Sequence, residues 1–266
     1  MKNILVPVGS SKNAKSHLQY AIDFAKAFGA KVYVVQIYNV YTKAGTMIKI
    51  DHILERESQN FLDEHVASID KKGVEVITRV FKGKLIDTIE FACKSLGVDL
   101  IVIEPRTNSI KEEVYLGNTS GKIIKQTQIP ALIVPENYEY KPIVKILMAV
   151  KSVLFKKENA LKPLTDIKDQ YKSILNLLLV ETPKYKEGDL DISEDLSKLI
   201  TNTSKSKSQT TFQGVLEHYQ KHNPDLLCVV RRKRGFFVKL WEDNTILKRD
   251  FHSTSIPVLV LSGLKK

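Results

Sequence analysis

The stretch "VDLIVIEP", Val98–Pro105, and the later run "IPALIVP", Ile129–Pro135, together decide the fold. Each is a short, almost continuous apolar run, which is typical of a strand buried on both faces of a parallel sheet. Both recur in the same order as "PDLLCVV", Pro224–Val230, and "IPVLVLS", Ile256–Ser262. Counted from the equivalent residues Glu104 and Val230, the segments that lead to the second run differ by one residue in length. Matched order and spacing of this kind indicate an internal duplication.

The duplication extends back to the start of each half. The runs "NILVPV" (Asn3–Val8) and "KVYVVQIY" (Lys31–Tyr38) have counterparts in "IVKILMAV" (Ile143–Val150) and "ILNLLLVE" (Ile174–Glu181). Amphipathic patterns of helical period separate the runs, and the longest predicts a helix that ends at Gly73. We therefore expect an α/β fold of two tandem doubly wound domains, each a five-stranded parallel sheet with helices on both faces.

The polar stretch "ENYEYKP" (Glu136–Pro142) indicates a linker between the two halves. A chain of 266 residues is long enough for two ordinary domains, which we place at 1–137 and 138–266. The low-complexity stretch "TNTSKSKSQ" (residues 201–209) lies where the second domain needs its third strand or the connection to it, so we do not interpret it as disordered.

Composition favours a folded cytoplasmic protein without a membrane segment. The hydrophobic fraction is 43%, and no apolar run approaches the roughly 18 residues that span a bilayer. The opening residues form a strand-like run without the pattern of a leader peptide. Both cysteines, Cys93 and Cys228, have apolar neighbours, which indicates buried free thiols.

The net charge of +11 permits an anionic partner, but the lysines are spread along the whole chain. Diffuse charge is typical of a solvated surface, so we do not expect nucleic-acid binding. The densest basic run is "RRKRGFF" (Arg231–Phe237), for which a solvated loop and an anion site built from side chains are both open interpretations.

Other signatures are incomplete. The opening "ILVPVGSSKNAKS" (Ile4–Ser16) approaches a phosphate loop, but Ala14 replaces its second glycine, and Asp99 begins its strand instead of ending it. His218 and His222 stand four apart without a third ligand, so we expect a surface pair and no metal site. No catalytic triad or dyad can be assembled from residue order.

With its "ILVPV" opening and its Gly-Asn-Thr step before the last helix and strand, the chain resembles the universal stress protein family in its tandem form. The resemblance implies that nucleotide-binding members hold ATP at the carboxyl ends of the strands, through the signature G-x-x-G, nine residues, G-[ST]. The glycines let backbone amides approach phosphates, and the final pair opens a helix.

This chain departs from that signature. Its first domain reads Glu104-x-x-Thr107, nine residues, Gly117-Asn118, and Gly9 stands where nucleotide-binding members usually carry aspartate. In the second domain Val230, Lys233 and Asp243 occupy the glycine positions. The candidate nucleotide or anion site lies in the first domain and comprises Pro7, Val8, Gly9, Ser10, Glu104, Thr107, Gly117, Asn118, Thr119 and Ser120.

We therefore interpret the chain as a non-catalytic regulatory or interaction protein of the universal stress type, with a degenerate nucleotide site and no firm cofactor. The alternative is a nucleotide sensor that binds ATP or AMP in the first domain, with slow hydrolysis. By the same resemblance we expect a homodimer and pairing of the two domains within the chain, because last strands commonly pair across such interfaces. The protein partner, the stress and the pathway are not encoded in any pattern that we can identify.

Overall fold

The computed structural model describes residues 1–9, 13–39, 47–105, 114–153, 159–183, 185–231, 246–247 and 255–262. Strands and helices alternate in the first half, residues 1–137: β1 (Asn3–Pro7), α1 (Ala14–Phe28), β2 (Lys31–Tyr38), α2 (Met47–Ala67), β3 (Val76–Lys82), α3 (Leu85–Ser95), β4 (Leu100–Ile103), β5 (Val114–Leu116), α4 (Asn118–Gln126) and β6 (Ala131–Ile133). The second half, residues 138–266, contains β7 (Lys145–Val150), α5 (Lys162–Tyr171), β8 (Ile174–Glu181), α6 (Glu194–Ser197), β9 (Asn202–Lys207), α7 (Thr211–His222), β10 (Leu226–Arg231), β11 (Ile246–Leu247) and β12 (Val258–Ser262).

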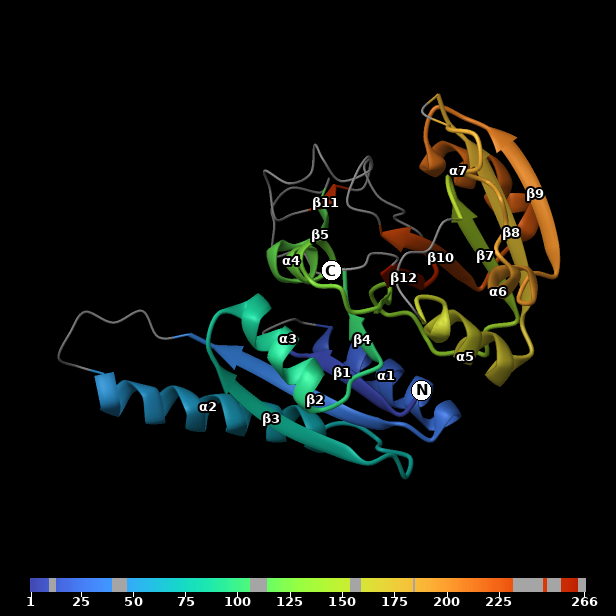
Figure 1. Ribbon diagram of the computed structural model, residues 1–266. Helices are drawn as coiled ribbons and strands as arrows, with labels where there is room; N and C mark the ends of the chain where they lie inside the picture. Colours follow the sequence, from blue (N-terminus) through green and yellow to red (C-terminus); the bar gives the residue numbers. More distant parts are fainter. Residues whose placement is uncertain are drawn as a thin grey trace.

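Ten of the strands form one sheet, in the order β3-β2-β1-β4-β6-β12-β10-β7-β8-β9. Pairing is parallel within each half, and the two halves meet where β6 and β12 pair antiparallel, with Leu259 opposite Leu132. Figure 1 shows the first half at the lower left and the second at the upper right, with β4, β12 and β10 between them. The α/β prediction is confirmed, and the last strands pair within the chain as expected.

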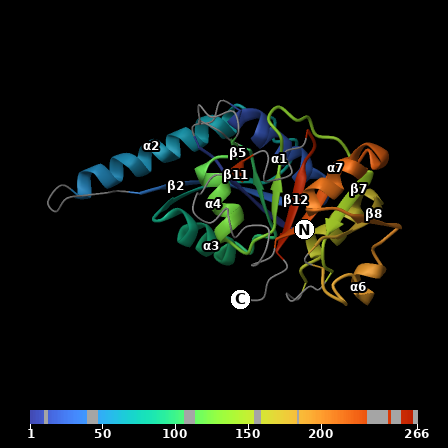
Figure 2. The same cartoon turned by 90° about the horizontal axis from the view of Figure 1, so that it is seen from above.

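Helices cover both faces of the sheet. Side chains of α1, α2 and α5 pack into one core layer, and side chains of α3, α4 and α7 pack into the other. Figure 2 shows α1 and α2 on one side of the first-half strands and α3 and α4 on the other. Within the described segments, no helix is both long enough and apolar enough to cross a bilayer.

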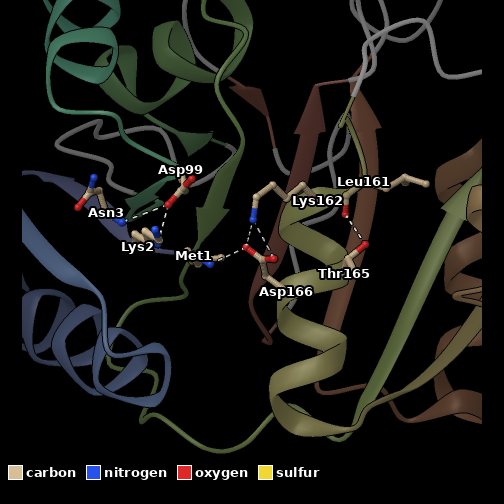
Figure 3. A network of polar contacts seen from close by, with 8 residues as sticks. All are labelled: Met1, Lys2, Asn3, Asp99, Leu161, Lys162, Thr165 and Asp166. Atoms are coloured by element: carbon tan, nitrogen blue, oxygen red, sulfur yellow. Dashed lines mark hydrogen bonds and ion pairs between the residues drawn. The ribbon is translucent and has the colours of Figure 1, made fainter.

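The duplication is visible in two equivalent aspartates. Asp99 Oδ2 accepts hydrogen bonds from the backbone amides of Lys2 (2.6 Å) and Asn3 (3.1 Å), as Figure 3 shows. Asp225 Oδ2 accepts from the amides of Val144 (3.0 Å) and Lys145 (2.9 Å). Each aspartate ties the start of one central strand to the start of its neighbour, so Asp99 has the strand-opening position that the sequence predicts.

The linker takes part in the contact between the halves. Its tyrosines pack edge to face on Tyr20 of α1, and the hydroxyl of Tyr140 lies 3.0 Å from that of Tyr171 on α5. Nearby, the ammonium group of Met1 lies 2.7 Å from Asp166 Oδ2, which also pairs with Lys162 at 2.8 Å (Figure 3). The stretch that looks polar in the sequence therefore contributes aromatic area to the interface.

Candidate functional site

A cleft of about 1030 Å³ opens at the carboxyl ends of β1, β2 and β4. The chain leaves β1 for β2 on one side, and reaches β4 on the other side only after β3 and α3. Such a reversal of strand order leaves a crevice above the sheet, which is where open α/β sheets bind ligands. We call this feature the first-half cleft.

Six of the residues predicted from sequence line the first-half cleft: Pro7, Val8, Gly9, Glu104, Thr119 and Ser120. Gly117 and Asn118 begin α4 beside it but are not among its lining residues. Ser10 and Thr107 lie outside the described residues. The structure thus brings together the ends of strands β1 and β4 and the start of helix α4 around the first-half cleft.

The start of α4 is built differently from the expectation. Gly117 is the residue before the helix, and its φ of −66° and ψ of 177° are open to any amino acid, so no left-handed backbone requires glycine there. The Ser120 hydroxyl donates to the Glu104 carbonyl oxygen at 2.9 Å. Its proton therefore holds the helix to the end of β4 and is not available to a ligand.

Two walls of the cleft were not predicted. Helix α2 supplies Leu54, Glu57, Ser58 and Phe61, and the turn from β3 into α3 supplies Gly83, Lys84, Leu85, Ile86 and Asp87. Gly83 has a φ of +148°, and a Cβ there would lie 2.6 Å from Thr88 Oγ1, so only glycine fits this turn without strain. The glycine directly after the third apolar run was the signal in the sequence.

Gln36, near the end of β2, also lines the cleft. Its Oε1 atom is buried and has no hydrogen-bond partner among the described residues. An unsatisfied buried amide oxygen is unfavourable by about 1–3 kcal/mol, and a ligand N–H or O–H group would remove that penalty. Nothing in the sequence distinguishes this glutamine from a solvated one.

The charged groups of the cleft are mixed. Lys84 and Lys122 provide two cations, whereas Glu57, Asp87 and Glu104 provide three carboxylates. The apolar lining includes Val35, Ile37, Leu54, Phe61 and Ile103. This composition suits a largely apolar ligand with a few polar groups better than a polyanion.

The described residues of the second half line a smaller space at a different place. This hollow of about 380 Å³ lies at the ends of β8 and β9. Beyond the end of β7, the Val153 amide donates to the Asp189 carbonyl oxygen at 2.8 Å. Of the second-domain signature positions, Val230 ends up within β10, and Lys233 and Asp243 lie outside the described residues.

The remaining candidates from the sequence are the basic run, the histidine pair and the two cysteines, and none of their described residues lines the first-half cleft. Arg231 is buried, with an exposed fraction of 9%, so the solvated-loop interpretation is wrong for this residue of the basic run. The rings of His218 and His222 lie 6.2 Å apart, and no group of three potential ligands is found in the part of the chain that the structure describes. Cys93 and Cys228 are buried free thiols, and burial raises the pKa of Cys93 to about 12.

Comparison with known proteins adds to this geometry. The family profile described as "Usp: Universal stress protein family" matches residues 1–135. The chain belongs to the universal stress protein family. Universal stress protein MJ0531 of Methanocaldococcus jannaschii is 28% identical over 139 residues, which are 50% of this chain and 81% of that protein.

Solved structures share the fold of both halves of the chain. A universal stress protein from Archaeoglobus fulgidus superposes with a TM-score of 0.72 at 17% identity, covering 98% of both chains. A functionally unknown protein from Pseudomonas aeruginosa, PA1789, gives a TM-score of 0.56 at 15% identity and covers 99% of this chain and 93% of that one. At such identities the likeness concerns the fold alone.

Proposed function

We propose that this universal stress protein is a cytoplasmic, non-catalytic regulator whose first-half cleft binds a nucleoside or nucleoside monophosphate and whose response is passed to a partner protein. The observation that carries the proposal is the first-half cleft itself, which is large enough for such a ligand and joins an apolar lining to the start of α4. The site is a degenerate nucleotide site because polyphosphate binding has been weakened.

The weakening is electrostatic. Like charges about 6 Å apart repel by about 0.7–2.8 kcal/mol at effective dielectric constants between 80 and 20. Each further phosphate charge that faces Glu104 therefore lowers affinity by roughly 3- to 100-fold. The two lysines offset part of this repulsion, which leaves room for one phosphate but disfavours three.

The alternative is a sensor that binds ATP as well as AMP in the first-half cleft. It is favoured by the orientation of α4, whose positive N-terminal end begins next to the cleft, and by Lys84 and Lys122 in its lining. A bound cation could also neutralise Glu104 when a triphosphate binds.

Calorimetric titration with AMP and with Mg-ATP separates the two functions. We expect AMP to bind at least about tenfold more tightly than Mg-ATP, and Glu104→Gln to narrow that ratio. Glu75→Gln is the matched control, since Glu75 is exposed and pairs with Lys31 away from the cleft. Micromolar binding of Mg-ATP that disappears in Gly117→Asp would favour the ATP sensor instead.

A further inference from the structure

Helix α4 has little intrinsic stability and depends on contacts with the rest of the chain. It spans nine residues, "NTSGKIIKQ", and its first turn consists of Asn, Thr, Ser and Gly, which are weak helix formers. Gly117 offers no side chain to cap it, and a helix this short is marginal without tertiary contacts. Yet α4 lines the first-half cleft through Thr119, Ser120 and Lys122, so its placement decides the shape of the site.

The second half contacts this segment just before the helix begins. Strand β11 pairs antiparallel with β5, with Ile246 opposite Leu116 and Leu247 opposite Val114. Leu116 is fully buried and directly precedes Gly117. The backbone that leads into α4 is therefore anchored by a strand from the other half of the chain.

The second half also contacts the far end of the helix. The guanidinium of Arg231, the last residue of β10, donates to the Ile124 carbonyl oxygen in the final turn of α4. A cation at this end complements the helix dipole and satisfies a carbonyl near the helix end. Burial lowers the pKa of Arg231 to about 10, with Glu90 acting in the opposite direction, so the guanidinium stays charged at neutral pH.

Among the residues that the structure describes, the first half has no counterpart of the contact that Arg231 makes with α4. Leu100 and Leu226 occupy equivalent register positions beside Ile4 and Ile146, so Arg231 corresponds to Pro105 of the first half. Proline has no group that could reciprocate the contact. The second half thus supports the half that contains the first-half cleft.

We propose that the second half acts as a clamp on residues 114–126, and that Arg231 is a positioning residue for the first-half cleft. This inference rests on the proposed function for its effect on ligand affinity, but the clamp itself is independent of any ligand. It gives the second half a role within the chain.

Hydrogen exchange of the ligand-free, full-length protein tests the clamp directly. In Arg231→Met, which keeps the length of the side chain but removes the charge, we expect the amides at the end of α4 to exchange about tenfold faster or more. Arg231→Lys should recover part of the protection. Lys205→Met, which removes the same charge from an exposed position on β9, should leave α4 unchanged.

Calorimetric titration with AMP tests the consequence for the cleft. We expect affinity to fall about fivefold or more in Arg231→Met, to recover partly in Arg231→Lys, and to stay at the wild-type value in Lys205→Met. Ile246→Pro removes one backbone amide from the β5–β11 pair, and should raise exchange at residues 114–117 even if Arg231→Met does not fold.

The outcomes are distinguishable. Unchanged α4 exchange in folded Arg231→Met, or unchanged exchange in Ile246→Pro, would overturn the clamp. Faster exchange with unchanged AMP affinity would overturn the positioning role of Arg231. If the wild-type protein binds neither AMP nor Mg-ATP while exchange still rises in both variants, the clamp stands and the proposed function fails.

Discussion

At the scale of single residues, the sequence was informative where a residue's role follows from its place in a strand or helix. The position of Asp99 at the start of its strand, and its repetition as Asp225, could be predicted because both follow the same apolar pattern. Gln36 could not, because its importance comes from one unsatisfied oxygen in a space formed by segments far apart in the chain. The same holds for Arg231, whose partner is more than a hundred residues away.

Gln36 should read a hydrogen-bond donor on the ligand. Replacing it by leucine, which keeps a similar volume, should weaken adenosine binding by about 5- to 50-fold, while Gln36→Glu should keep most of the affinity because an acceptor remains and adenosine has no phosphate for the new carboxylate to repel. Titration of both variants beside the wild type measures this. Equal affinities for the leucine and glutamate variants would show that the amide oxygen does not contact the ligand.

Asp225 should contribute to the acid stability of the fold. Burial acts to raise its pKa, but the Lys145 amide and the Lys141 ammonium outweigh burial and hold the pKa below its ordinary value. A carboxylate with a depressed folded-state pKa adds stability above its unfolded pKa, near 3.9, and that stability is lost as pH falls towards the folded value.

Urea denaturation between pH 7 and pH 2.5 should therefore show Asp225→Asn less stable than the wild type by about 1–2 kcal/mol at pH 7, with the difference shrinking below about pH 4. Asp169→Asn, at an exposed position, is the control. A difference that stays constant down to pH 2.5 would mean that the charge of Asp225 is not what stabilises the fold.

At the scale of elements, the apolar runs predicted most strands of the large sheet, whereas β9 lies in the polar low-complexity stretch, which its place in the second half assigned to the third strand or the connection to it. The predicted end of α2 was wrong, since the helix stops at Ala67 and not at Gly73. The amphipathic pattern continues into a turn where Lys72 and Gly73 both have positive φ, which no periodicity reveals. The pair of β5 and β11 was not predicted, because two and three residues of strand carry no detectable alternation.

The turn from β3 into α3 gives a test at this scale. Gly83→Ala should destabilise the protein by about 1–3 kcal/mol, because a Cβ would meet Thr88 Oγ1 in an already unfavourable backbone conformation. Gly73→Ala is the matched control, with a positive φ but no neighbour within 4 Å of its Cβ. If thermal denaturation shows the same loss of stability for Gly83→Ala and Gly73→Ala, Thr88 has no steric role.

At the scale of the whole molecule, the last strands of the two halves, β6 and β12, pair with each other within one chain. They are therefore not available to pair with a second chain. The domain boundary between residues 137 and 138 stays a prediction. So does the homodimer, which would have to use another surface, such as the outer strands β3 and β9. β9 carries exposed Lys205 and Lys207, which oppose edge-to-edge association.

Light scattering at micromolar concentrations tests the homodimer. We expect a mass near twice the 30.2 kDa of the chain. If the protein dimerises through β3, Val80→Pro should reduce the mass to that of one chain, since the β2–β3 register turns the Val80 amide to the open side of this edge strand and proline removes that donor. A mass near 30.2 kDa for the wild type at every concentration would contradict the prediction.

The central claim is that each chain has one ligand site, in the first half, and that this site no longer favours a polyphosphate. Native mass spectrometry of the purified full-length protein, with AMP and Mg-ATP supplied in equal amounts, tests it most directly. We predict one AMP per chain, and loss of that adduct when Gln36 is replaced by leucine but not when Lys205 is replaced by methionine. Two ligands per chain, or an ATP adduct that exceeds the AMP adduct, would contradict the account.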